Sequence, residues 1–147
     1  MTDCKVSLAP SQPLSGQEYN LLAARTHAYG QAFAKFDATA ACKMLSDDVV
    51  YESQMVLSPL VGKEAVAAHI KKRFEFLREH IAGDFRISRG EVELPAGSNY
   101  PCLILQRGET RDALLVLELN SDAKIVRLDF LVVLPHPDQA TALGDPL

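Results

Sequence analysis

The sequence predicts an α+β fold, because helical patterns come first and a run of strand patterns follows. Residues 15–36 and 62–81 repeat apolar side chains at spacings of three and four, as one buried face of a helix does. After Gly83 and Asp84 the apolar residues recur at every second position, which is typical of strands. Helices followed by consecutive strands favour an α+β fold over a doubly wound sheet. We expect three helices to cover one face of the sheet and to leave the other to solvent or a partner.

The first helix is predicted from its capping residues and from one buried stripe. Ser15 is placed to act as N-cap, and Glu18 three residues later completes a capping box. The stripe consists of Leu22, Thr26, Tyr29, Phe33 and Phe36. Asp37 then caps a short second helix over residues 38–45, whereas residues 1–14 contain turn formers and are expected to be an N-terminal arm.

The segment 45–70 is expected to carry a strand followed by the third helix. Tyr51, Ser53 and Met55 share one face of that strand, because successive side chains point to opposite sides. Two hydroxyls on one strand face suggest a pocket wall with polar anchors. The stripe of the third helix consists of Val66, Ile70, Phe74, Leu77 and Ile81. At about 100° per residue, His69 lies at the edge of this stripe and Arg73 nearer its middle.

The second half of the chain is expected to form antiparallel strands. The predicted strands are 85–94, with a bulge at residues 88–90, then 101–107, 111–120 and 124–134. The last two form a hairpin that turns at Ser121 and Asp122. Three prolines after residue 134 end regular pairing, so residues 135–147 are expected to be a loose C-terminal tail.

Composition excludes several classes of function. The formal net charge of −4 provides no basic surface for nucleic acid. Three cysteines without a CxxC pair fit a reduced, cytoplasmic protein. No signal peptide is predicted, and no apolar run approaches the ~20 residues that a membrane helix needs. The four histidines lack HxH or HExxH spacing, so neither a metal nor another cofactor is predicted.

The order of elements resembles that of the NTF2-like superfamily, which has a cone-shaped, cystatin-like α+β fold. Its members include nuclear transport factor 2, SnoaL-like proteins and ketosteroid isomerase. The closest local match is to ketosteroid isomerase, on Tyr29, residues 47–53 (DDVVYES) and residues 62–68 (GKEAVAA), over roughly a quarter of the chain. The resemblance implies that three N-terminal helices pack on a curved, mostly antiparallel sheet within residues 15–134.

The same resemblance implies a modified site. Tyr29 falls where the isomerases have an oxyanion-hole tyrosine, and His69 where they have a pocket-lining aromatic residue. Ser53 replaces the general-base aspartate, and Leu115 the second, protonated aspartic acid. A serine hydroxyl cannot replace a carboxylate base, so steroid isomerisation by the usual route is not expected.

The candidate catalytic residues are therefore Tyr29, Ser53 and His69. The predicted ligand-binding wall consists of Phe33, Tyr51, Met55, Leu115, Leu117, Leu128, Phe130 and Val132. Two alternatives stay open: the hydroxyls satisfy one another in a packed core, and His69 is structural. Arg127 and Asp129 belong on the outer sheet surface, unless the register slips by one residue and exchanges the faces.

The favoured function is that of a SnoaL-like small-molecule pocket protein for an apolar ligand, with isomerase, lyase, cyclase or hydrolase activity among the options. A binding domain without catalysis and a protein-interaction module are the alternatives. We also expect a homodimer through the outer face of the last two strands, around Val116 and Arg127, because three helices leave that face uncovered.

Overall fold

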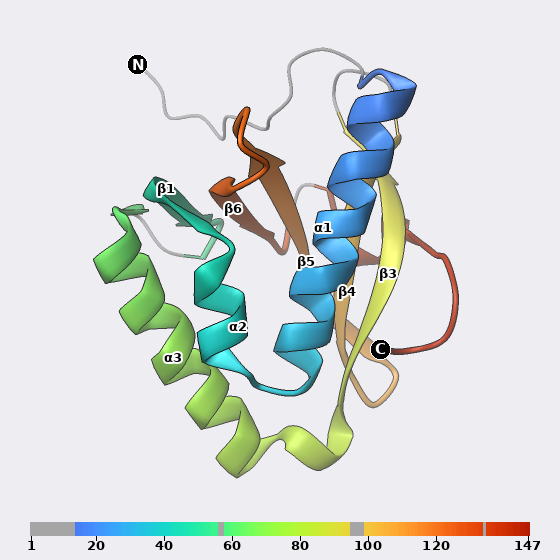
Figure 1. The fold of residues 1–147 in the computed structure, drawn as a ribbon. Helices are drawn as coiled ribbons and strands as arrows, with labels where there is room; N and C mark the ends of the chain where they lie inside the picture. Colours follow the sequence, from blue (N-terminus) through green and yellow to red (C-terminus); the bar gives the residue numbers. More distant parts are fainter. Residues whose placement is uncertain (1–13, 56–57, 95–98, 134) are drawn as a thin grey trace.

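The computed structural model describes residues 14–55, 58–94, 99–133 and 135–147. In this part of the chain the predicted α+β architecture is confirmed (Figure 1). The helices are α1 (Gly16–Ala34), α2 (Ala38–Lys43) and α3 (Lys63–His80), with the short 3-10 turns η1 (Ala82–Asp84) and η2 (Pro137–Gln139). The strands are β1 (Leu45–Ser53), β2 (Leu60–Val61), β3 (Phe85–Glu93), β4 (Asn99–Arg107), β5 (Thr110–Leu119), β6 (Ile125–Leu131) and β7 (Thr141–Ala142).

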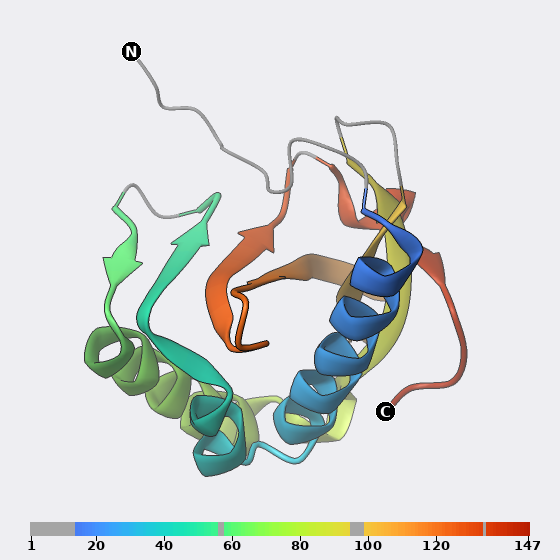
Figure 2. The same ribbon diagram turned by 45° about the horizontal axis from the view of Figure 1, so that its top comes forward.

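The strands of the described residues form one sheet in the order β2-β1-β6-β5-β4-β3-β7. Only the β1–β6 pair is parallel, so the sheet is mostly antiparallel, as expected. Figure 2 shows the sheet curving, with α1 in front of β3 and β4 and α3 beside β1. These helices and the concave face of the sheet enclose the core, which confirms the expected cone.

Helix α1 begins as the capping box predicts. The Glu18 N–H donates to the Ser15 hydroxyl over 3.1 Å, and the Ser15 N–H donates to the Glu18 carboxylate over 2.8 Å. The predicted stripe is buried from Leu22 to Phe33. The helix ends at Ala34 rather than Phe36, because Phe36 adopts φ 53°, a left-handed conformation that cannot continue a right-handed helix.

Strand alternation divides the sheet into an inner face toward the helices and an outer face. Across β5 and β6 the pairs are Leu115 with Phe130 and Val116 with Asp129. Ser53 of β1 lies beside Phe130, and Glu52 beside Asp129. Members of each pair share a face, so Phe130 is inside and Asp129 outside, in the register that the sequence predicts.

The predicted bulge at residues 88–90 is wrong. Strand β3 pairs with β4 without interruption, and Gly90 lies directly opposite Cys102. A Cβ at Gly90 would be 2.7 Å from Ile104 Cδ1 and 3.0 Å from the Thr141 carbonyl oxygen. Glycine is therefore needed here for close packing rather than for a bulge.

The prediction of a loose tail over residues 135–147 is also wrong. Strand β7 pairs with β3, and the Leu147 N–H donates to the Ile87 carbonyl over 2.8 Å. The Arg111 guanidinium donates to the Pro137 and Ala140 carbonyls over 3.2 and 2.7 Å. Strand β6 ends at Leu131, before Pro135, and the backbone of residues 137–147 finds partners on β3 and on Arg111.

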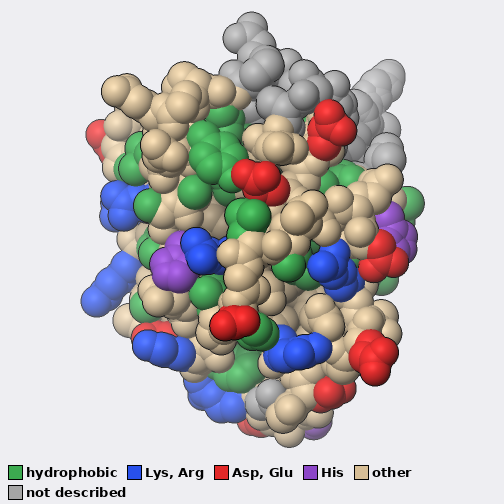
Figure 3. Space-filling view, turned by 90° about the vertical axis from the view of Figure 1, so that its right-hand side faces the viewer, with side chains coloured by type: hydrophobic (Ala, Val, Ile, Leu, Met, Phe, Trp, Pro, Cys, Tyr) green, Lys and Arg blue, Asp and Glu red, His purple; other side chains and the backbone are tan. Residues whose placement is uncertain are grey.

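The outer face of the sheet is consequently not left bare. Val116 is only 2% exposed in the single chain, and Ile104 and Leu114 are equally buried. Acidic and basic side chains are interspersed on the side of the molecule that carries β3 and the C-terminal segment (Figure 3). Among the described residues, no helix has the length and apolarity to cross a membrane.

The close approach at Gly90 yields a test of the docked C-terminal segment. Gly90→Ala should lower the free energy of unfolding by about 1–3 kcal/mol, because the Thr141 carbonyl belongs to the paired β7 strand and cannot yield freely. Urea unfolding measures the change. The control is Gly16→Ala, where an added Cβ meets nothing within 4 Å. Equal stability of the Gly90 variant and the wild type would contradict the docked segment.

Candidate ligand-binding site

A small cavity lies between α1, α3 and the inner face of the sheet. Its volume is about 20 Å³, which is room for roughly one water molecule. It is lined by Tyr29, Phe33, Tyr51, His69, Ile70, Arg73, Phe74, Leu115 and Phe130. Six of these residues were predicted from the sequence as site or wall residues, and the fold brings them together.

Aromatic packing explains why the predicted hollow is nearly filled. The Phe33 ring centroid is 4.6 Å from that of Phe74 on α3 and 5.7 Å from that of Phe85 on β3. Tyr29 meets the edge of Phe33 with the ring centroids 6.3 Å apart. The side chains that line the cavity therefore turn toward one another and occupy most of its space.

Tyr29 contributes a hydroxyl without a partner to this cavity. Its side chain is 2% exposed, and no hydrogen bond joins the hydroxyl to another described residue. Burial raises the pKa of Tyr29, so the group remains a protonated donor at neutral pH. This donor is therefore available to an acceptor such as a ligand oxygen or a water.

His69 and Tyr51 form the second polar pair of the cavity. Their ring centroids are 4.6 Å apart. Burial, helped by the charges of Arg73 and Lys72, lowers the pKa of His69 below 6.5, so the imidazole is neutral at pH 7. Burial raises the pKa of Tyr51, although Arg73 opposes the rise. Neutral rings with hydrogen-bonding atoms therefore border the cavity beside Tyr29.

A larger groove opens at the mouth of the cone, next to the small cavity. Its volume is about 410 Å³, within the range of small-molecule sites. It is lined by Met55, Arg73, Phe76, Leu77, Ile81, Phe85, Leu105, Arg107, Asp112, Phe130 and Val132. Arg73 and Phe130 belong to both spaces, and the Arg73 guanidinium carbon lies 5.7 Å from the centroid of the Phe130 ring. This pair separates the cavity from the groove.

Three predicted residues line neither space. The Ser53 hydroxyl instead accepts a hydrogen bond from the nearby Met55 N–H over 3.1 Å. Leu117 and Leu128 face each other across β5 and β6 and are fully buried in the core. Met55 and Val132, predicted as cavity wall, line the groove instead.

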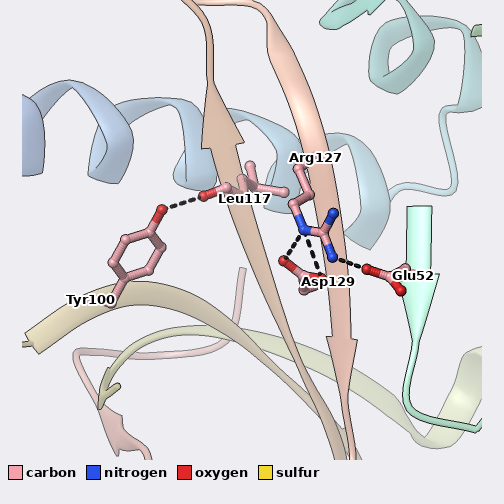
Figure 4. Close-up of polar contacts among 5 residues, drawn as sticks. All are labelled: Glu52, Tyr100, Leu117, Arg127 and Asp129. Atoms are coloured by element: carbon pink, nitrogen blue, oxygen red, sulfur yellow. Dashed lines mark hydrogen bonds and ion pairs between the residues drawn. The ribbon is translucent and has the colours of Figure 1, made fainter. Parts of the chain in front are cut away.

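A polar cluster occupies the outer face behind the cavity (Figure 4). Arg127 lies between Glu52 and Asp129 and forms ion pairs with both, with its Nε 3.0 Å from Asp129 Oδ2. The Tyr100 hydroxyl donates to the Leu117 carbonyl over 2.8 Å in the same view. Asp129 was expected on the sheet surface, but it is only 3% exposed. Strand alternation directs its carboxylate away from the cavity.

Burial sets the titration of Asp129. It raises the pKa of this carboxyl from 3.8 to about 6, although Arg127 acts in the opposite direction, and Glu118 adds to the rise. The raised pKa of Asp129 agrees with the geometry, because Glu52 and Asp129 share the single guanidinium of Arg127.

Sequence reasoning missed Arg73 as a site residue. The sequence does contain a signal for it, because Arg73 is a charged residue near the middle of the apolar stripe of α3. Ile70 and Phe74 were assigned to the buried stripe but not to the site. Among the described residues, no group of three histidine, cysteine, aspartate or glutamate side chains is placed to hold a metal ion.

Comparison with known proteins identifies the fold. No protein-family model and no curated protein matches the sequence. A SnoaL-like protein of unknown function from Burkholderia thailandensis is similar in structure, with 16% identity, a TM-score of 0.56, and coverage of 90% of this chain and 100% of that one. A steroid delta-isomerase from Pseudomonas aeruginosa is similar with 17% identity, a TM-score of 0.52 and coverage of 82% of each chain.

A Mycobacterium tuberculosis protein solved in complex with estradiol-17β-hemisuccinate is also similar. Its identity is 17%, its TM-score 0.53, and the match covers 82% of this chain and 98% of that one. Other similar structures are described as NTF2-like or cystatin-like. The chain therefore has the NTF2-like fold, as the sequence resemblance implied.

The outer cluster generates a pH prediction. The native Asp129 carboxyl keeps its proton up to about pH 6, whereas the unfolded carboxyl releases it near 3.9. The folded state thus binds the extra proton between these values, and this contribution to stability is lost as the pH rises through that window. The free energy of unfolding of the wild type minus that of Asp129→Asn should fall by about 1–3 kcal/mol between about pH 4 and pH 7.

Urea unfolding of both proteins across this range measures the difference. Exposed Glu75→Gln is the control for the loss of one carboxyl group and should change the free energy of unfolding by less than about 0.5 kcal/mol. A wild-type advantage that grows with pH would contradict the raised pKa and would show that the ion pair with Arg127 dominates.

Proposed function

We propose that this protein binds a small, largely apolar molecule at the mouth of the cone, with the polar end of the ligand directed toward Arg73 and the inner cavity. The observation that carries the proposal is the open groove beside a cavity in which the Tyr29 hydroxyl has no hydrogen-bond partner among the described residues. The 20 Å³ cavity alone is too small for such a ligand, because small-molecule sites occupy about 300–1,000 Å³.

The composition of the groove supports an apolar ligand body. Met55 is 73% exposed and Phe76 is 50% exposed, and both lie in the groove with Leu77, Ile81 and Val132. Large apolar side chains that are exposed to water around a concave surface indicate a binding site. Burying them against a ligand would stabilise the complex by about 25 cal/mol per Å² of apolar area buried. The M. tuberculosis protein of similar structure was solved in complex with estradiol-17β-hemisuccinate, which also supports a largely apolar ligand.

Catalysis by isomerase, lyase, cyclase or hydrolase chemistry stays a prediction. His69 is the candidate acid or base that lines the cavity, since Asp129 points to the other face. Its lowered pKa keeps the base form at neutral pH. If a bound compound is converted, His69→Gln should abolish the conversion at unchanged binding. Conversion that persists in the variant would exclude the role.

The homodimer also stays a prediction, and its original motive does not hold. Val116 is already buried in the single chain, so the outer face presents Glu52 and Arg127 rather than an apolar surface. Light scattering at micromolar concentration decides between monomer and dimer.

The proposed site predicts a specific loss of binding. Phe76→Glu should weaken the binding of a neutral fluorescent probe, N-phenyl-1-naphthylamine, by about tenfold or more, because a charge would be desolvated inside an apolar groove. Titration of the probe, followed by its fluorescence, measures the affinity.

The matched control is Val61→Glu. Val61 is 66% exposed on the short β2 strand and does not line the groove. Equal probe affinity in the two variants, or no saturable binding to the wild type, would contradict the proposed function.

A further inference from the structure

Arg73 is an exposed cation at the boundary between the inner cavity and the groove. It lines both the inner cavity and the groove, yet no described residue forms an ion pair or hydrogen bond with its guanidinium. Its neighbour across the groove, Arg107, is different, because Asp112 lies 2.6 Å from its Nε. Arg127 on the outer face is likewise paired, with two carboxylates.

The charges of the groove therefore do not cancel. Three charged side chains line it, namely Arg73, Arg107 and Asp112. Because Arg107 and Asp112 neutralise each other, one net positive charge remains, and it is on Arg73. The inner cavity adds no negative charge, since no carboxylate lines it.

The surroundings make this charge effective. The guanidinium lies over the Phe130 ring, and Met55, Phe76 and Leu77 line the same groove. Arg73 is exposed in the free chain, but an apolar ligand body that covers the groove would exclude water and so strengthen an ion pair formed there. The planar guanidinium fork suits a carboxylate, which it binds through two parallel hydrogen bonds.

We propose that the ligand is an amphipathic carboxylate, whose apolar body lies in the mouth groove and whose carboxylate is bound by Arg73. This inference rests on the proposed function, because it names the ligand class for the same groove. It assigns Arg73 as the residue that selects anionic over neutral ligands. The apolar pattern of α3 does not by itself require an arginine at this position.

Three probes with the same chain length test the charge preference. Decanoate, decanamide and decylammonium share an apolar body but carry a negative, a neutral and a positive end. Isothermal titration of the full chain at low salt should give an affinity for decanoate about tenfold or more above that for decanamide, with decylammonium weakest. Higher salt should reduce the preference for decanoate.

Variants assign the preference to Arg73. Arg73→Gln should bring the affinity for decanoate down to that for decanamide and leave the affinity for decanamide within about twofold. Arg73→Lys keeps the charge without the fork and should give an intermediate value. Lys71→Gln removes a charge from the same helix, outside the groove, and should leave the preference intact. Thermal unfolding of each variant confirms that it is folded.

The outcomes separate the two proposals. Equal affinities of the wild type for decanoate and decanamide, or a preference for decanoate that survives in Arg73→Gln, would overturn the anion inference and leave the apolar site standing. If none of the three probes binds, the proposed function itself is wrong, and the inference fails with it.

Discussion

The site depends on one packing interaction, the insertion of the Phe33 ring between α3 and β3. Phe33 belongs to α1, yet its ring contacts those of Phe74 and Phe85. One side chain thereby ties the first helix, the third helix and the start of the antiparallel strands together. Its consequence is a nearly filled interior. The close-packed aromatic cluster leaves little space inside the cone, and the adjoining groove opens where the helices and strands diverge, at its mouth.

Strand alternation then decides which charges can reach a ligand. Glu52 and Asp129 belong to the outer set of positions, and Tyr51 and Phe130 to the inner set. Both carboxylates consequently share Arg127 behind the sheet, while Arg73 approaches the inner face from α3. The sheet thus separates an ionic cluster, in which two carboxylates share one guanidinium, from Arg73, for which the described residues provide no counter-ion.

Local patterns predicted most of the fold because each is fixed by nearby residues. The capping box at Ser15 and the alternation at Tyr51 depend on a few neighbours, and both are as expected. The course of residues 135–147 was not predictable in this way, since it depends on Arg111 and on the close approach at Gly90, far away in sequence. Most of the predicted wall residues line the small cavity or the groove, but the sequence could not predict how much space remains there, because that depends on how the aromatic rings turn toward one another.

The charge of the site also follows from what the sequence lacks. The resemblance places Ser53 and Leu115 where ketosteroid isomerases have carboxyl groups, and neither residue can carry a negative charge. The Ser53 hydroxyl is engaged by the Met55 N–H, and Leu115 contributes only apolar surface to the cavity. A carboxylate on this inner wall would offset the charge of Arg73 and repel an anion. Among the described residues no carboxylate lines the inner cavity, so the anionic ligand proposed for Arg73 would meet no opposing charge on that side.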